Sequence, residues 1–227
     1  MLESIHSDKA ALAAAAADHL AAAAARAIAT RGHFALALSG GSTPWAMLAE
    51  FAEREVDWAH VHVFQVDERA VPDGDDARNW THVNASLLDR VPIPAGHAHP
   101  MPVLDDPETA ATAYAATLGA VLGATPVLDV VQLGMGADGH TASLIPADPV
   151  LEVADRDVAW AVHPYQGTRR MTLTFPCLAR AREVVWLVAG ADKRPMVERL
   201  RAADPTIPAG RVPQDNATLF ADAAAAD

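Results

Sequence analysis

Apolar and polar positions along the chain fall into blocks that predict helices and strands in turn. Apolar residues at helical spacing predict helices at about residues 7–30, 43–55, 80–89, 108–122 and 191–203. Short apolar runs predict strands near residues 33–38, 61–66, 127–133, 158–163, 170–175, 183–189 and 218–220. The segments 67–79 and 91–107 carry neither pattern, and we expect a loop and a proline-rich connection there.

Several of the strand segments are apolar throughout, as in the run from Val184 to Val188. Strands of this kind are typical of parallel sheets buried on both faces. We therefore expect an α/β fold, in which a mostly parallel open sheet is covered by helices on both faces as a Rossmann-like three-layer sandwich. A length of 227 residues suits a single domain over residues 1–227.

The first predicted helix is rich in alanine, but its larger residues follow an amphipathic pattern. Leu12, Leu20 and Ile28 are eight residues apart and share one face. Asp18 and Arg26 argue against burial in lipid. The N-terminus also lacks the basic region and cleavage pattern of a signal peptide. We therefore expect a helix of the fold, and no membrane partner.

The composition indicates which cellular compartment and which classes of partner to expect. The only cysteine, Cys177, excludes an internal disulfide and is expected in the core, which favours the reducing cytoplasm. The formal net charge of −12 argues against nucleic acid as a partner, because nucleic acid is bound through clustered Lys and Arg. The 17 basic residues still suffice to bind a small anionic substrate in a pocket.

Candidate chemistry begins where the strand near 33–38 ends. Hydroxyl groups and glycines follow it directly, and they can offer donors to a phosphate at the positive end of the next helix. We expect Thr43 to cap that helix and Pro44 to occupy its first position. The sequence is not a Walker loop, because no Gly-Lys-Ser/Thr follows. The candidate phosphate-binding residues are Ser39, Gly40, Gly41, Ser42 and Thr43.

A second glycine-rich loop follows the strand 127–133 and presents an acid and a histidine, Asp138 and His140. In open α/β sheets, ligands bind at the carboxyl ends of strands. A free imidazole has a pKa of about 6.5, so a histidine here suits proton transfer. We expect His140 in the first turn of a helix, which would disfavour its protonation. Taken alone, the motif is equally typical of a turn with solvated side chains.

Charged residues also accompany three other strands. Asp67, Glu68 and Arg69 follow the strand 61–66, Arg170 opens a later strand, and Lys193 follows the strand 183–189. These groups suit an orienting acid and phosphate-binding cations. Each is also compatible with a solvated surface charge or an ion-paired turn.

Together, five collinear motifs resemble the 6-phosphogluconolactonase family of the sugar-phosphate isomerase/deaminase-like superfamily. They are Ser39–Pro44, Asp67–Arg69 with Val71, Leu133–Pro146, Arg170–Thr174, and Gly190 with Lys193. The resemblance implies a hydrolase without cofactor or metal, which opens 6-phospho-D-glucono-1,5-lactone to 6-phospho-D-gluconate in the oxidative pentose phosphate pathway. The partner is then a small phosphorylated sugar lactone.

The resemblance also implies catalytic and substrate-binding roles for individual residues. Lactone hydrolysis needs a base for water, donors for the oxyanion and a grip on the distant phosphate. His140 suits the base, and either Asp138 or Asp67 would orient it. The expected substrate-binding residues are the loop Ser39–Thr43, Arg69, Asn79, Gly136, Arg170 and Lys193. Relatives often carry Ser-Asn where this chain has Arg78-Asn79, so only Asn79 carries over, and Ile145 replaces the usual Phe.

Three other functions compete with this interpretation. Gly134, Gly136 and Gly139 also fit the dinucleotide fingerprint GxGxxG, but Pro146 and Pro149 leave little room for the helix that it requires. A glucosamine-6-phosphate deaminase-like isomerase needs a Glu five residues after the histidine, where this chain has Ile145. A noncatalytic sugar-phosphate-binding sensor usually carries an added DNA-binding segment, for which one domain leaves no room.

A histidine pair in the proline-rich connection, His97 and His99, raises the question of a metal site. Two ligands without HExxH or a third partner are a weak metal signal. We expect both histidines to be surface residues.

Overall fold

A six-stranded sheet forms the centre of the computed structural model, which describes residues 1–226. The strands pair in parallel throughout, as predicted. Their order across the sheet is β1 (Leu2–His6), β9 (Ala217–Asp222), β8 (Glu183–Val188), β5 (Val130–Leu133), β2 (Phe34–Leu38) and β3 (Val61–Gln65). The edge strand β1 was not predicted, because Leu2 and Ile5 are exposed and polar residues separate them.

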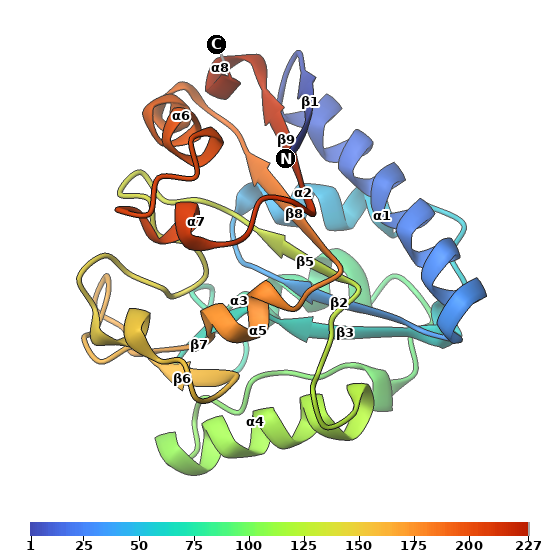
Figure 1. The fold of residues 1–227 in the computed structure, drawn as a ribbon. Helices are drawn as coiled ribbons and strands as arrows, with labels where there is room; N and C mark the ends of the chain where they lie inside the picture. Colours follow the sequence, from blue (N-terminus) through green and yellow to red (C-terminus); the bar gives the residue numbers. More distant parts are fainter. Residues whose placement is uncertain (227) are drawn as a thin grey trace.

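Helices cover both faces of this sheet, which confirms the predicted three-layer sandwich (Figure 1). Alternation along β2 shows how: Phe34, Leu36 and Leu38 pack on one face and Ala35 and Ala37 on the other. The first face is covered by α1 (Lys9–Arg31), α2 (Ser42–Phe51), α3 (Asn79–Val83) and η2 (Asn84–Leu88). The second is covered by α4 (Pro107–Leu122), α5 (Phe175–Ala179), α6 (Arg194–Arg201), α7 (Pro208–Arg211) and α8 (Ala223–Ala226).

A second, antiparallel sheet lies beside the first and was not predicted. It consists of β4 (Asp67–Arg69), β7 (Arg170–Leu173) and β6 (Val158–Trp160), in that order. The prediction of a loop beginning at residue 67 is therefore wrong for three residues. Val66 joins the two sheets, because its N–H donates to Leu38 O and its carbonyl accepts from Leu173 N–H. Asp67–Arg69 consequently lies at the junction of the sheets.

Helix α1 is long and apolar enough by composition to cross a membrane, but here it packs as a layer of the fold. Leu12 and Leu20 are fully buried and Ile28 packs against the same cluster, which confirms the predicted face. The Asp8 side chain accepts hydrogen bonds from two N–H groups of the first turn. Gly32, with φ +80°, ends the helix in the left-handed conformation that glycine tolerates.

The start of α2 differs from its prediction. The helix begins at Ser42, with Gly41 as N-cap and no capping side chain, and Pro44 is its third residue. The expected Thr43 cap is therefore wrong. The N-cap Gly41 has φ +123°, a conformation that strongly favours glycine.

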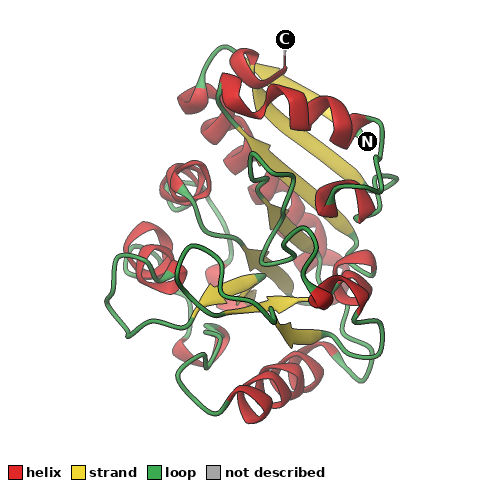
Figure 2. Cartoon of the chain, turned by 90° about the vertical axis from the view of Figure 1, so that its left-hand side faces the viewer, coloured by secondary structure: helices red, strands yellow, loops and turns green. Residues whose placement is uncertain are grey.

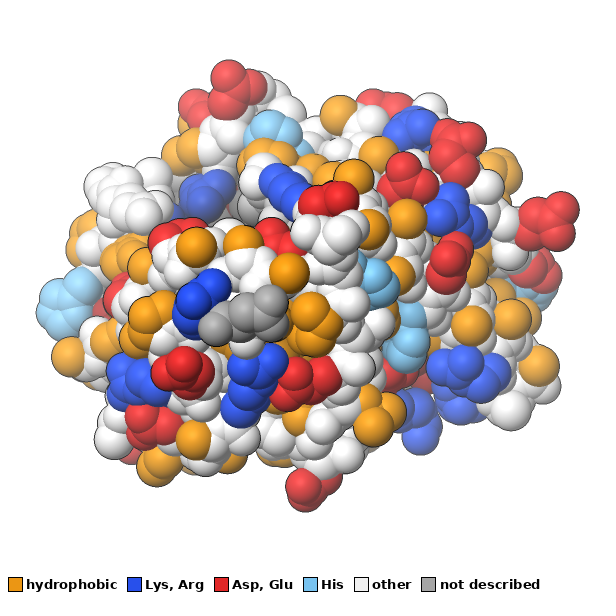
Figure 3. Space-filling model, turned by 90° about the horizontal axis from the view of Figure 1, so that it is seen from above, with side chains coloured by type: hydrophobic (Ala, Val, Ile, Leu, Met, Phe, Trp, Pro, Cys, Tyr) orange, Lys and Arg blue, Asp and Glu red, His pale blue; other side chains and the backbone are white. Residues whose placement is uncertain are grey.

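Short 3₁₀ segments complete the chain: η1 (Trp58–His60), η3 (Ala95–His97), η4 (Pro149–Glu152) and η5 (Ala191–Lys193). Cys177 is a buried free thiol in the core, as expected, and burial raises its pKa to about 12. On the face drawn in Figure 3, Lys and Arg side chains lie among Asp and Glu rather than in one basic stripe.

The expectation that His97 and His99 are surface residues is wrong. Both are half-buried. The rings of His62 and His97 stack at 3.8 Å, and His62 Nδ1 lies 3.1 Å from His99 Nε2. His33 approaches the same ring of His62, so four histidines meet where β2 and β3 begin.

Candidate active site

The carboxyl ends of four parallel strands, β2, β3, β5 and β8, meet at one edge of the sheet. This edge faces the viewer in Figure 2, where loops gather in front of the strands. The loops enclose a cavity of about 260 Å³. It is lined by Ser39, Gly40, Asp67, Arg69, Asn79, Gly134, Met135, Gly136, His140, Ala142, Gln166, Arg170 and Lys193.

Most residues expected at the site line this cavity. They are Ser39, Gly40, Asp67, Arg69, Asn79, Gly136, His140, Arg170 and Lys193. Gly41, Ser42 and Thr43 line an adjoining cavity of about 300 Å³, which shares Gly40, Gly134, Met135 and Lys193 with the first. The Ser42 hydroxyl already accepts a hydrogen bond from Lys9 Nζ at 2.8 Å.

Asp138 and His140 form a hydrogen-bonded pair in the turn after β5. Asp138 Oδ1 lies 2.6 Å from His140 Nδ1 and also accepts the His140 backbone N–H at 3.1 Å. A carboxylate can only accept, so Nδ1 carries the proton and Nε2 carries the lone pair. This tautomer can take a proton from a bound water.

The backbone of this turn forces the pair together. Gly136 N–H donates to His140 O at 2.9 Å, and a Cβ on Gly136 would collide with the His140 ring. No helix follows: the next helical segment, η4, begins at Pro149. The expected helical first turn around His140 is therefore wrong. The same fact weakens the dinucleotide interpretation, because GxGxxG requires a helix there.

The segment before β7 contributes two residues that the sequence did not reveal. Tyr165 and Thr168 exchange backbone hydrogen bonds and form a tight turn that closes one side of the cavity. The Tyr165 hydroxyl donates to Asp138 Oδ2 at 3.1 Å. Gln166 lines the cavity and its Oε1 accepts from Arg170 Nη2 at 3.2 Å. Nothing in the local pattern marks these residues, because the turn approaches the site only through the antiparallel sheet.

The electrostatics of the turn keep Asp138 ionised. Burial raises the pKa of the Asp138 carboxyl, but hydrogen bonds from His140 and Tyr165 and the charge of His140 outweigh it, so the pKa is lowered overall. Burial and the neighbouring Asp138 raise the pKa of Tyr165. The phenol therefore remains a hydrogen-bond donor around neutral pH.

Asp67 has a different partner from the one that the sequence allowed. Its Oδ2 accepts from Ser143 Oγ at 2.7 Å, and its carbonyl accepts from Asn79 Nδ2 at 3.1 Å. Of the two acids that could orient His140, Asp138 is thus the one in contact with it. Asp67 is buried and lines the cavity. Burial lowers the pKa of Arg170, and the charge of Asp67 opposes that change.

Glu68 lies behind the cavity and hydrogen-bonds the backbone of residues that line it. The carboxylate is fully buried and accepts from Gln65 Nε2 and from the N–H groups of Arg69, Asn79 and Trp80 at 2.7–2.8 Å. Burial raises its pKa, and these four bonds oppose the rise. Alternation along β4 explains the arrangement, since Asp67 and Arg69 face the cavity while Glu68 faces away.

Two buried glutamines also support the site through hydrogen bonds, and the sequence could have marked them. Gln132 and Gln65 lie in mainly apolar strand segments, and both are fully buried. Gln132 Oε1 accepts from the N–H and the hydroxyl of Ser39 at 3.1 and 3.0 Å. A polar residue inside a buried strand must find such partners, so both could have been marked as supports of the site.

Three cations surround the cavity. Arg170 is 4% exposed, and its Nε has no hydrogen-bond partner among residues 1–226. Arg69 donates to Ala77 O and to Asn79 Oδ1, which fixes its guanidinium at the rim. Lys193 Nζ lies 3.2 Å from the exposed Asp192 carboxylate. An unpaired buried guanidinium nitrogen favours an anionic ligand.

A close approach explains a glycine of the first loop. A Cβ on Gly40 would collide with the Asn79 side chain, so glycine lets the loop after β2 pack against the start of α3. Within residues 1–226, no group of three or more His, Cys, Asp or Glu is placed to hold a metal ion.

Known proteins resemble the chain in sequence and in fold. The family described as glucosamine-6-phosphate isomerases/6-phosphogluconolactonase matches residues 7–220. A 6-phosphogluconolactonase from Nostoc is 42% identical over 182 residues, covering 78% of this chain and 75% of the relative. One from Mycobacterium tuberculosis is 39% identical over 229 residues, covering 95% and 93%. The crystal structure of 6-phosphogluconolactonase from Thermotoga maritima superposes with a TM-score of 0.87 at 26% identity, covering 97% of this chain and 98% of that one.

Proposed function

The chain belongs to the family of glucosamine-6-phosphate isomerases and 6-phosphogluconolactonases, and we propose that it is a 6-phosphogluconolactonase. It hydrolyses 6-phospho-D-glucono-1,5-lactone to 6-phospho-D-gluconate, the reaction of the oxidative pentose phosphate pathway. The observation that carries this proposal is the Asp138–His140 pair facing a cavity that also contains Arg69, Arg170 and Lys193. A base and a cationic anion site in one small cavity match a phosphorylated lactone.

His140 acts as the general base. Its Nε2 takes a proton from water as the water oxygen attacks the lactone carbonyl carbon. When the tetrahedral intermediate collapses, the bond from that carbon to the ring oxygen breaks, and the imidazolium returns the proton to the departing oxygen. Asp138 holds the ring in the required tautomer and stabilises the imidazolium between the two steps.

The cations bind the phosphate at the far end of the substrate. Arg170, Lys193 and Arg69 supply charge-assisted hydrogen bonds, and the glycine loop from Ser39 adds donors around the substrate. Asn79 and Gly136 complete the binding surface. No step in this scheme draws on a metal or a nucleotide, so we expect activity to survive EDTA.

The family name also includes isomerases that act on glucosamine 6-phosphate, but one residue argues against that activity here. Ile145 stands five positions after His140, where the isomerising deaminases carry a glutamate, and an alkyl side chain cannot exchange protons. The relatives of this chain described above are all named 6-phosphogluconolactonase.

The decisive experiment generates 6-phosphogluconolactone in situ and compares its decay with and without the protein. Spontaneous hydrolysis gives the baseline, and unphosphorylated gluconolactone serves as control substrate. We expect strong acceleration for the phosphorylated lactone and little for the control. Equal turnover of both would contradict the phosphate site, and conversion of glucosamine 6-phosphate would favour the isomerase.

A further inference from the structure

We infer that Tyr165 is a positioning residue, which fixes the Asp138–His140 pair through its hydroxyl and supports Arg170 through its ring. This inference rests on the proposed function for its catalytic consequence. The residue contacts both halves of the site: the acid/base pair on one side and a candidate phosphate-binding cation on the other.

The contact with the acid is the more specific of the two. Asp138 divides its oxygens between two partners: Oδ1 faces His140, whereas Oδ2 accepts the Tyr165 hydroxyl at 3.1 Å. Hydrogen bonds at both oxygens restrain the carboxylate about its last torsion, which keeps the bond to Nδ1 aligned. The Tyr165 ring also lies edge-on to the His140 ring, with centroids 5.1 Å apart. Together these contacts restrict the imidazole in position and in tilt.

The contact with the cation involves the ring of Tyr165. The Arg170 guanidinium carbon lies 5.1 Å from the Tyr165 ring centroid, within the range of a cation–π interaction. Gln166 accepts from the same guanidinium at Nη2. Two adjacent residues of one turn therefore hold a buried cation that lines the cavity.

The turn that carries Tyr165 is itself held in place by hydrogen bonds on both sides. On its N-terminal side, the buried Asp148 carboxylate accepts from the N–H groups of Val162 and His163 at 3.1 and 2.9 Å. On its C-terminal side, Arg170 begins β7, which pairs with both neighbours of the antiparallel sheet. Tyr165 is thus held from a rigid element and not from a free loop.

Removing the hydroxyl has a predictable electrostatic sign. Without its second donor, Asp138 keeps more of its negative charge for His140, and the imidazolium becomes more stable. The other charged groups around the cavity are Arg170 from β7, Asp67 and Arg69 from β4, and Lys193 after β8. None of these changes in the variant, so the shift reports the Tyr165 bond.

The test is an NMR titration of the His140 imidazole, assigned by its absence in His140→Asn, with kinetics on the same proteins. Tyr165→Phe keeps the ring and should raise the titration midpoint by about 0.3–1 pH unit. The acidic limb of kcat/KM should move in the same direction, with KM little changed. Tyr165→Leu also loses the ring, and should additionally raise KM about 3–10-fold.

Thr168→Val is the matched control. Thr168 Oγ1 donates to Tyr165 O within the same turn and does not touch the acid/base pair. Its variant should titrate as the wild type. An unchanged midpoint in Tyr165→Phe, or an equal shift in Thr168→Val, overturns the inference. A shift without any lactonase activity in the wild type would instead reject the proposed function and leave the positioning role standing.

Discussion

The two edges of the central sheet both gather ionisable side chains, but they use them differently. At the carboxyl edge, His140 keeps the lone pair on Nε2 and Arg170 keeps an unpaired Nε beside a cavity. At the amino edge, buried Asp129 accepts from Arg31 at 2.7 and 2.9 Å and from Ala35 N–H at 2.8 Å. There the Asp129 carboxylate is paired with groups of the protein itself.

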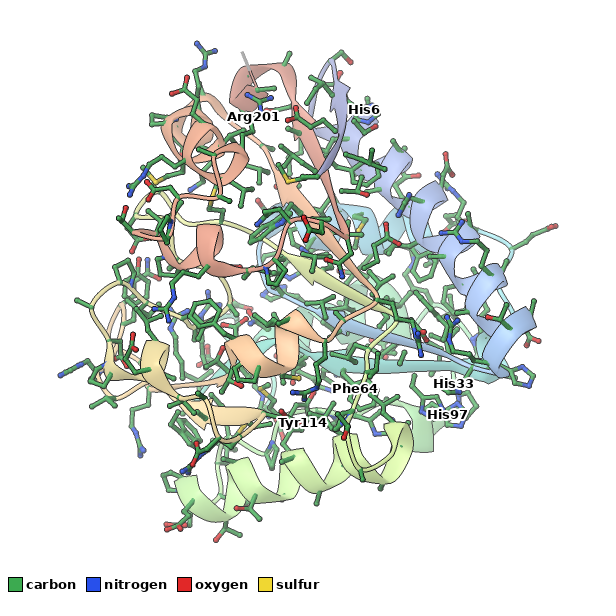
Figure 4. All side chains as sticks on the ribbon, in the orientation of Figure 1. His6, His33, Phe64, His97, Tyr114 and Arg201 are labelled. Atoms are coloured by element: carbon green, nitrogen blue, oxygen red, sulfur yellow. The ribbon has the colours of Figure 1, made fainter. Side chains whose placement is uncertain are left out.

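The histidines at the amino edge also contact one another, although His97 Nδ1 is buried without a hydrogen-bond partner among residues 1–226. His62 and His99 are hydrogen-bonded to each other, and Figure 4 shows His33 and His97 at this edge, near the starts of β2 and β3. By residue type alone this cluster looks more reactive than the single His140. The working site is distinguished by an acid/base pair that faces a cavity lined by cations, and residue type alone does not separate it from the structural cluster.

The largest expected effect tests the carboxyl edge. His140→Asn preserves shape but removes the proton acceptor, so kcat should fall by about 10²–10⁴-fold, the usual contribution of a general base. The free energy of unfolding should change little. The measurement is steady-state kinetics on the folded variant, with urea unfolding in parallel. Near-wild-type turnover with the same acidic limb would transfer the role of base to another group.

The converse effect is expected at the amino edge. Asp129→Asn leaves Arg31 and the Ala35 N–H poorly paired in a buried place, so unfolding should become easier by about 1–3 kcal/mol. The kcat of the folded protein should stay at the wild-type value. Urea denaturation measures the first and kinetics the second.

Asp57→Asn is the control for this prediction. Asp57 pairs with His60 at the exposed surface, and such pairs contribute only about 0–1 kcal/mol. If Asp129→Asn were no more destabilising than Asp57→Asn, the buried charges of the amino edge would have no structural role.

The cations of the carboxyl edge should show a binding effect. Arg170→Ala and Lys193→Ala each remove a charge-assisted contact that is made in both ground and transition state. KM for the phosphorylated lactone should rise about 10–100-fold, and kcat should fall less. Arg169→Ala is the matched control, because Arg169 lies over Trp160 and does not line the cavity. Wild-type KM in both test variants would assign these cations to the solvated surface.

Much of this architecture could be predicted from sequence, because the major strands and helices carry their own periodicity. Helix α4 and strand β3 are examples whose bounds nearly match the prediction. The antiparallel sheet could not be predicted in the same way. Strand β4 has three residues, all of them of types charged at neutral pH in solution, and its pairing with β7 depends on partners about a hundred positions away.

The candidate site was likewise predicted only in part. Most residues of the collinear motifs lie around one cavity or the adjoining one, because parallel strands bring their carboxyl ends to one edge. The hydrogen-bond partners and local backbone of these residues could not be predicted from the sequence. Asp67 accepts a hydrogen bond from Ser143, and the turn that contains His140 is not helical. Tyr165 was missed because its contact with Asp138 spans 27 positions and arises only through the packing of the second sheet.

The smallest expected effect is the pH dependence contributed by the amino edge. Burial, with the neighbouring His97, His99 and His33, lowers the pKa of His62 to about 4. In the unfolded chain a histidine has a pKa of about 6.5, so between these values the unfolded state binds more protons. The free energy of unfolding must then fall as the pH is lowered through this window. Because the ring is partly exposed, we expect a loss of only about 1 kcal/mol by pH 4.5.

His62→Gln should flatten this dependence, whereas His60→Gln, which removes only an exposed pair with Asp57, should change it less. Urea midpoints measured from pH 7 to pH 4.5 provide the test. A His62→Gln slope equal to that of the wild type would mean that the histidine cluster takes up its protons without cost to the fold. The kcat of both variants at neutral pH should match the wild type, since neither residue lines the cavity at the opposite edge.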